Sequence, residues 1–182
     1  MNHDALVKYF LTVADASKIP ILLYNVPKFT HLSLSLKTVH QLSGHENIVG
    51  MKDSSGNVPQ LAMFKAQLDS RFTVLVGTAG AWLPALQLGI EGGILALANC
   101  CPNECAGVRE LFLKGRGQEA LELYQRLLPV NQAVTATYGV SGLKYACDLR
   151  GLHGGFVRTP LLPLTDSQKA DLRNLMTHAR VL

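Results

Sequence analysis

Four short, almost uninterrupted apolar runs constrain the fold of this chain more than any other feature. The runs cover residues 19–24, 48–52, 72–77 and 93–98. Between them, apolar residues recur every three to four positions, which is the spacing of one helix face. Strands that are apolar on both faces are typical of parallel sheets flanked by helices. The alternation therefore predicts an α/β fold built from four βα units.

After the fourth run the chain is expected to be helical, apart from a Gly- and Pro-rich connection over 151–163. Thr165 and Gln168 form a capping-box pattern at the start of the last expected helix. Two of the expected helices come just before this connection, and the first of them should end near Pro129. The expected helices cover residues 2–14, 34–42, 58–68, 82–88, 102–114, 120–128, 143–149 and 166–180.

Length suggests how these units are organised. A (β/α)8 barrel typically takes about 250 residues, whereas this chain has 182 residues and begins in an expected helix. We therefore predict part of a TIM (β/α)8 barrel, with about four βα units and a C-terminal helical region. Residues 1–116 would form half of a barrel, equivalent to strands five to eight, and residues 117–182 would form helices that pack on it.

Composition argues against several functional classes. The seventeen Lys and Arg residues are scattered and the net charge is +4, so a solvated surface is favoured over nucleic-acid binding. No apolar run approaches the roughly 20 residues of a membrane span. The N-terminal segment resembles neither a signal peptide nor a transit peptide. We therefore expect no nucleic-acid partner and no membrane insertion.

The four cysteines do not suggest a metal site. Cys100, Cys101 and Cys105 form a C-C-x-x-x-C pattern, which is not a zinc spacing, and Cys147 lies far along the chain. Buried free thiols are the favoured interpretation. The histidines also form no H-E-x-x-H motif, so we expect neither a metal nor another cofactor.

Lys52 ends the second apolar run and is the strongest candidate for chemistry. Active sites of such barrels lie at the carboxyl ends of their strands. An amine that projects into an apolar barrel mouth would lose solvation, which lowers its pKa and exposes a nucleophilic lone pair. Taken alone, a lysine at the end of a strand reaching for solvent is the commoner explanation.

Tyr24 ends the preceding run at an equivalent level. Neighbouring strands lie about 4.8 Å apart, so a phenol and an amine at matching positions can address one substrate. A boundary tyrosine hydrated by water is the alternative for Tyr24 alone. Gly77 follows the third run, where a missing side chain would admit a ligand, although an ordinary loop glycine explains it equally well.

Three segments in this order resemble the dihydrodipicolinate synthase / N-acetylneuraminate lyase family. They are Tyr24-Asn25-Val26-Pro27, then Gly50-Met51-Lys52-Asp53-Ser54-Ser55-Gly56, then Gly92-Gly93-Ile94 with Ala98-Asn99. The resemblance implies a (β/α)8 barrel in which Lys52 forms a Schiff base with a small 2-oxo acid and Tyr24 relays protons. It also implies that Gly77 and Ile94 line the substrate site, and that the protein is a homo-oligomer, a tetramer in the family.

Within the family, the chain most resembles members that cleave 4-hydroxy-2-oxoglutarate to pyruvate and glyoxylate in animal mitochondria, which implies that activity and location. Two departures matter. Phe29 stands where dihydrodipicolinate synthases normally carry an arginine that binds a carboxylate. The family's first four strands, with the hydroxyl pair that contacts the substrate carboxylate, have no counterpart here. The alternatives are a non-catalytic chain that is inert or binds full-length subunits, and another lyase or synthase of the family.

Overall fold

The computed structural model describes residues 2–182, which form two compact units that divide between Ile94 and Leu95. The division precedes the boundary that we expected after residue 116. It does so because α6 (Pro102–Leu113) packs against α7 (Gly117–Gln132) within the second unit. No helix among the described residues has the length and apolar character needed to cross a membrane.

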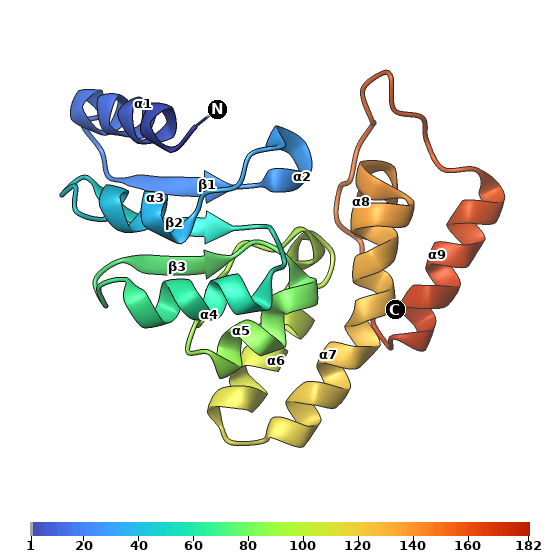
Figure 1. Cartoon of the computed structure of the whole chain (residues 1–182). Helices are drawn as coiled ribbons and strands as arrows, with labels where there is room; N and C mark the ends of the chain where they lie inside the picture. The colour runs from blue at the N-terminus through green and yellow to red at the C-terminus, as the bar shows by residue number, and fades with distance from the viewer. Residues whose placement is uncertain (1) are drawn as a thin grey trace. The chain divides into compact units, whose positions relative to one another are not determined.

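The first unit is a four-stranded parallel sheet in the order β1-β2-β3-β4, with helices between the strands. Figure 1 shows the first three strands side by side with their arrows pointing the same way. This confirms the expected α/β fold. The elements are α1 (His3–Ala16), β1 (Ile21–Asn25), α2 (Pro27–Thr30), α3 (Leu36–Leu42), β2 (Ile48–Asp53), α4 (Val58–Gln67), β3 (Thr73–Val76), the 3-10 turn η1 (Ala79–Ala81), α5 (Trp82–Gln87) and β4 (Gly92–Gly93).

The two faces of this sheet differ in burial. Leu23 and Met51 are register partners on one face and are buried, as are Leu42 and Phe64 on the helices. On the other face, Leu22 and Tyr24 of β1 are exposed. Successive side chains of a strand point to opposite faces. The core of the first unit therefore lies on one side of its sheet, and the other side stays open to solvent.

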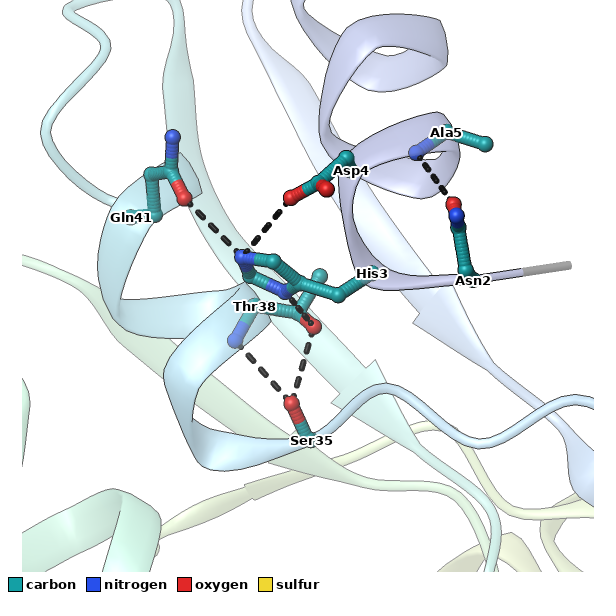
Figure 2. A network of polar contacts seen from close by, with 7 residues as sticks. All are labelled: Asn2, His3, Asp4, Ala5, Ser35, Thr38 and Gln41. Carbon is teal, nitrogen blue, oxygen red and sulfur yellow. Dashed lines mark hydrogen bonds and ion pairs between the residues drawn. The ribbon is translucent and has the colours of Figure 1, made fainter.

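A histidine network ties α1 to α3 (Figure 2). His3 places Nδ1 2.9 Å from Thr38 Oγ1 and Nε2 3.2 Å from Gln41 Oε1. Ser35 caps α3 by accepting from the Thr38 N–H at 3.1 Å, and its hydroxyl lies 2.8 Å from Thr38 Oγ1. The polar groups at the start of α3 are therefore satisfied by its own cap and by the first helix.

The fourth strand is much shorter than we predicted. Residues 93–98 were expected to be extended, yet β4 ends at Gly93 and the 3-10 turn η2 (Ala96–Asn99) follows. Only the Ile94 N–H, which donates to Val76 O at 2.9 Å, prolongs the pairing. A short apolar run cannot be assigned to strand or helix by periodicity alone, which explains the error.

The second unit is helical. After α6 and α7 the chain continues through the π-helix η3 (Ala133–Thr137), α8 (Gly139–Leu149) and α9 (Asp166–His178). The predicted helix end at Pro129 is wrong, because α7 runs through this residue to Gln132. A proline inside a helix costs about 3 kcal/mol. Burial of Leu127 and Val130 on either side of it offsets that cost.

The predicted capping box at the start of α9 is confirmed. Thr165 Oγ1 accepts from the Gln168 N–H at 3.3 Å, and Gln168 Oε1 accepts from the Thr165 N–H at 2.9 Å. We expect Thr165→Ala to lower the free energy of unfolding by about 1 kcal/mol. Chemical denaturation with Ser167→Ala as the control measures this, since that variant loses the same hydroxyl inside the exposed first turn. Equal stability of the two variants would contradict the prediction.

All four cysteines lie in the second unit, where they are buried and form no disulfide, as predicted. Cys101 Sγ lies 3.8 Å from Cys100 Sγ. Burial, assisted by Cys101 and Glu104, raises the pKa of Cys105 to about 12. The thiol form therefore dominates at neutral pH.

These thiols should resist alkylation while the protein is folded. The thiolate is the reactive form, and a pKa near 12 leaves about one Cys105 in ten thousand ionised at pH 8. Because all four thiols are buried and shielded from the reagent, we expect intact-mass measurements to find no iodoacetamide on the native chain and four additions after denaturation. Rapid labelling of Cys105 in the folded chain would show that this thiol is accessible and ionised.

Candidate active site

Tyr24 and Lys52 are direct register partners on the open face of the sheet. β1 pairs with β2 so that Tyr24 stands beside Lys52, and β3 and β4 extend the same row with Leu75 and Gly92. Each of these four register partners lies near the carboxyl end of its strand. The parallel pairing therefore brings the predicted phenol and the predicted amine to the carboxyl edge of one sheet face.

The amine lies against the phenol ring. Lys52 Nζ is 4.5 Å from the centroid of the Tyr24 ring, within the range of a cation–π contact. Tyr24 remains 49% exposed and Lys52 is half-buried. The water-poor barrel mouth that we expected around Lys52 is not formed by the described residues alone, because the open face carries no covering layer within the first unit.

Gly77 lies against the Lys52 side chain. Its N–H donates to Asp53 O at 2.6 Å, which continues the pairing of β2 and β3 by one residue. A Cβ at position 77 would lie 2.8 Å from Lys52 Cε and would also overlap Ser54 Oγ. The position therefore admits no side chain while the lysine keeps this conformation. Gly77 shapes the space beside the amine, which is the arrangement that a substrate-lining role requires.

Ser54 and Ile94 lie just beyond the carboxyl ends of β2 and β4. Ser54 is two residues after Lys52 and Ile94 is two residues after Gly92, so both lie on the same sheet face as Tyr24. Ile94 is 52% exposed. Ser54 Oγ donates to Gly77 O at 3.4 Å. We predicted no role for Ser54, although its position two residues after Lys52 indicates that it lies on the same face.

This arrangement suits carbonyl chemistry. A primary amine can attack a ketone, and an adjacent phenol can accept or donate a proton during the reaction. The bare backbone of Gly77 lies beside the Lys52 side chain, and the exposed apolar side chain of Ile94 lies on the same sheet face, just after β4. All four residues predicted for the site lie on one sheet face within the first unit.

Comparison with known proteins finds a family of similar proteins. The model of the Dihydrodipicolinate synthetase family matches residues 1–179. Relatives named 4-hydroxy-tetrahydrodipicolinate synthase, from Oceanobacillus iheyensis and Methanosphaerula palustris, are 32% identical over 176 residues and 36% identical over 177 residues. Each match covers 97% of this chain but only 60% of the relative.

Solved structures agree with the family match. A crystal structure of dihydrodipicolinate synthase from Bacillus anthracis superimposes with a TM-score of 0.92 at 30% identity, covering 97% of this chain and 61% of that one. The 4-hydroxy-tetrahydrodipicolinate synthase of Methylacidiphilum fumariolicum superimposes with a TM-score of 0.90 at 28% identity, over 99% of this chain and 60% of that one. The chain thus spans about three fifths of the proteins that it matches.

Proposed function

Because the chain belongs to the dihydrodipicolinate synthetase family, we propose that Lys52 is the amine of a Schiff-base aldolase site that binds a small 2-oxo acid. The observation that carries this proposal is the position of Lys52 Nζ, 4.5 Å from the centre of the Tyr24 ring at the carboxyl edge of the sheet. Of the proposed substrate-lining residues, Gly77 lies beside the Lys52 side chain and Ile94 lies on the same sheet face just after β4. The cleft for a whole substrate would need residues beyond those of the first unit.

The proposed reaction begins when Lys52 Nζ attacks the C2 carbonyl of the substrate and water leaves. The resulting iminium withdraws electrons from the C3–C4 bond, which breaks and releases the C4 fragment as an aldehyde. Tyr24 accepts the proton of the C4 hydroxyl and passes its own phenol proton to water. An enamine remains on the lysine, takes a proton at C3, and is released by water as pyruvate. Covalent catalysis replaces one difficult cleavage by easier steps, and positioned proton transfer adds about 10²–10⁴-fold.

Our proposed substrate is 4-hydroxy-2-oxoglutarate, with glyoxylate as the second product. Phe29 supports this choice, because dihydrodipicolinate synthases normally have an arginine at this position that binds a carboxylate. Phe29 is 74% exposed on α2, just beyond the strand that carries Tyr24. The related proteins named as synthases make condensation chemistry the competing possibility.

Reductive trapping tests the proposal. Borohydride delivers hydride to an imine carbon and converts the adduct into a stable secondary amine. We expect incubation with pyruvate and borohydride to add one reduced pyruvate unit, and peptide mass spectrometry to locate it on Lys52. Labelling of another lysine, or of none, would contradict the proposal. Labelling by pyruvate but not by 4-hydroxy-2-oxoglutarate would favour the synthase chemistry.

A second candidate function is a non-catalytic chain that binds full-length subunits of the same family. The open sheet face favours it, because Leu22 and Ile94 are exposed apolar residues of this face or its margin. β1 also has a free edge, since it pairs only with β2 in the described sheet, and such edges pair readily with other chains. We also propose that the protein is a homo-oligomer and is located in mitochondria, as the resemblance implies.

Sizing the purified chain during an assay of glyoxylate release separates the two functions. We expect the chain alone to form the imine but to turn over negligibly, because Tyr24 is 49% exposed and the reacting groups are not enclosed. A complex formed upon addition of a full-length family member would support the non-catalytic function. Steady turnover by the isolated 182-residue chain would contradict it.

A further inference from the structure

Directly behind the candidate site, the opposite sheet face holds two buried polar residues. Asn25 follows Tyr24 and Asp53 follows Lys52, and the two are register partners. Both are almost fully buried, with exposures of 1% and 0%. Alternation along the strands turns their side chains away from the amine and toward the core. Each residue that carries the proposed chemistry is therefore followed in its own strand by a buried polar residue.

These residues form a continuous set of hydrogen bonds, which we call the Asn25–Asp53 bridge. Asn25 Nδ2 donates to Asp53 Oδ2 at 2.5 Å, and Asn25 Oδ1 accepts from the Leu34 N–H at 3.0 Å. Asp53 Oδ1 accepts from the Ser55 N–H at 3.0 Å and from the Ser55 hydroxyl at 2.5 Å. The three groups that donate to the carboxylate are neutral.

Burial of a carboxylate without a cation is expensive unless hydrogen bonds compensate it. The bridge supplies them, yet an apolar pair at these positions would fill the core without that cost. The bridge also joins side chains across two strands at the level where the Ser54 N–H makes its 2.8 Å bond to Asn25 O. The bridge therefore adds a side-chain constraint to the backbone hydrogen bonds, and together they fix how the ends of β1 and β2 are aligned along the strand direction.

We propose that Asn25 and Asp53 are positioning residues that hold Lys52 against Tyr24. The proposal rests on the proposed function, because positioning matters only if the amine reacts. A displacement of one strand end along the other moves the phenol relative to the amine, and a misplacement of about 1 Å can cost about 100-fold in rate. The bridge acts from the far face of the sheet and touches no substrate.

The polarity of the bridge suggests a swap experiment. Asp53→Asn places an amide NH2 against the NH2 of Asn25, and turning Asn25 around sets the NH2 of Asn25 against the Leu34 N–H. Turning the new amide at position 53 instead sets its NH2 against the Ser55 N–H. Every arrangement therefore leaves two donors facing each other. In the double variant Asn25→Asp with Asp53→Asn, the new carboxylate accepts from the Leu34 N–H and from the new amide NH2, while the new amide oxygen still accepts from Ser55. The double variant thus restores every hydrogen bond.

Two readouts report the position of the amine. The Lys52 ε-methylene protons should show an upfield NMR shift caused by the Tyr24 ring, identified by its loss in Tyr24→Leu. The rate of pyruvate trapping by borohydride, expressed per folded molecule, reports reactivity. We expect Asp53→Asn to reduce the upfield shift and to slow trapping about tenfold or more, and the swap to recover both. Asp69→Asn, at an exposed carboxylate paired with Arg71, is the matched control.

The outcomes separate the two proposals. If Asp53→Asn lowers stability but leaves the methylene shift and the trapping rate unchanged, the bridge has only a structural role. That result would overturn the inference. A double variant that fails to fold, or that folds without recovering either readout, would also overturn it. A wild-type chain that traps no pyruvate contradicts the proposed function instead, and the methylene shift then decides the positioning by itself.

Discussion

Lys52→Met is expected to abolish borohydride trapping of pyruvate on this chain. Methionine keeps an unbranched side chain of similar length but has no amine, so no imine can form. Lys52→Arg is expected to have the same effect, because the guanidinium stays protonated at all accessible pH values and offers no lone pair. Intact-mass measurement after reduction should show the adduct on the wild-type chain and none on either variant.

A lysine elsewhere in the same unit provides the control. Lys65 is an exposed residue in the last turn of α4, and Lys65→Met removes an equal charge without touching the sheet. We expect this variant to be labelled like the wild type. Undiminished labelling of Lys52→Met would show that another amine forms the imine, and the proposed role of the Tyr24–Lys52 pair would then fail.

Gly77→Ala is expected to slow imine formation by about 100-fold, the cost of a misplacement of about 1 Å. The added methyl group would overlap Ser54 Oγ and would lie 2.8 Å from Lys52 Cε, contacts that real Cβ atoms do not tolerate, so both side chains must shift. The lysine, as the flexible partner, should move away from the Tyr24 ring. The trapping rate at saturating pyruvate measures the loss, and the Lys52 ε-methylene shift detects the movement.

Gly44→Ala is the matched control for this prediction. A Cβ at position 44 would meet only Gln41 O at 3.5 Å, an ordinary van der Waals contact. This variant should trap pyruvate at the wild-type rate. If Gly77→Ala also reacts at that rate while it stays folded, the close approach of Gly77 to the lysine has no functional consequence.

Much of the fold could be predicted from local patterns. The helix expected over 58–68 is α4, and its inward residues Leu61 and Phe64 are buried as the helical spacing requires. The errors arose where a local rule competes with packing. Pro129 lies inside α7 because buried neighbours outweigh its cost. The apolar run over 93–98 becomes a two-residue strand and a 3-10 turn, since apolar character alone does not specify the backbone conformation.

The candidate site likewise has features that local sequence patterns predict and features that depend on packing. The positions of Tyr24 and Lys52 near the ends of consecutive apolar strands could be predicted from the sequence, because a buried strand is apolar and the first polar residues lie near its end. The folded structure was needed to establish three features. They are the register that sets Lys52 beside Tyr24, the close approach of Gly77, and the burial of Asn25 and Asp53 on the opposite face. These features depend on pairing between strands about 25 residues apart in the chain, typical of βα units, and a single sequence carries no direct record of that pairing.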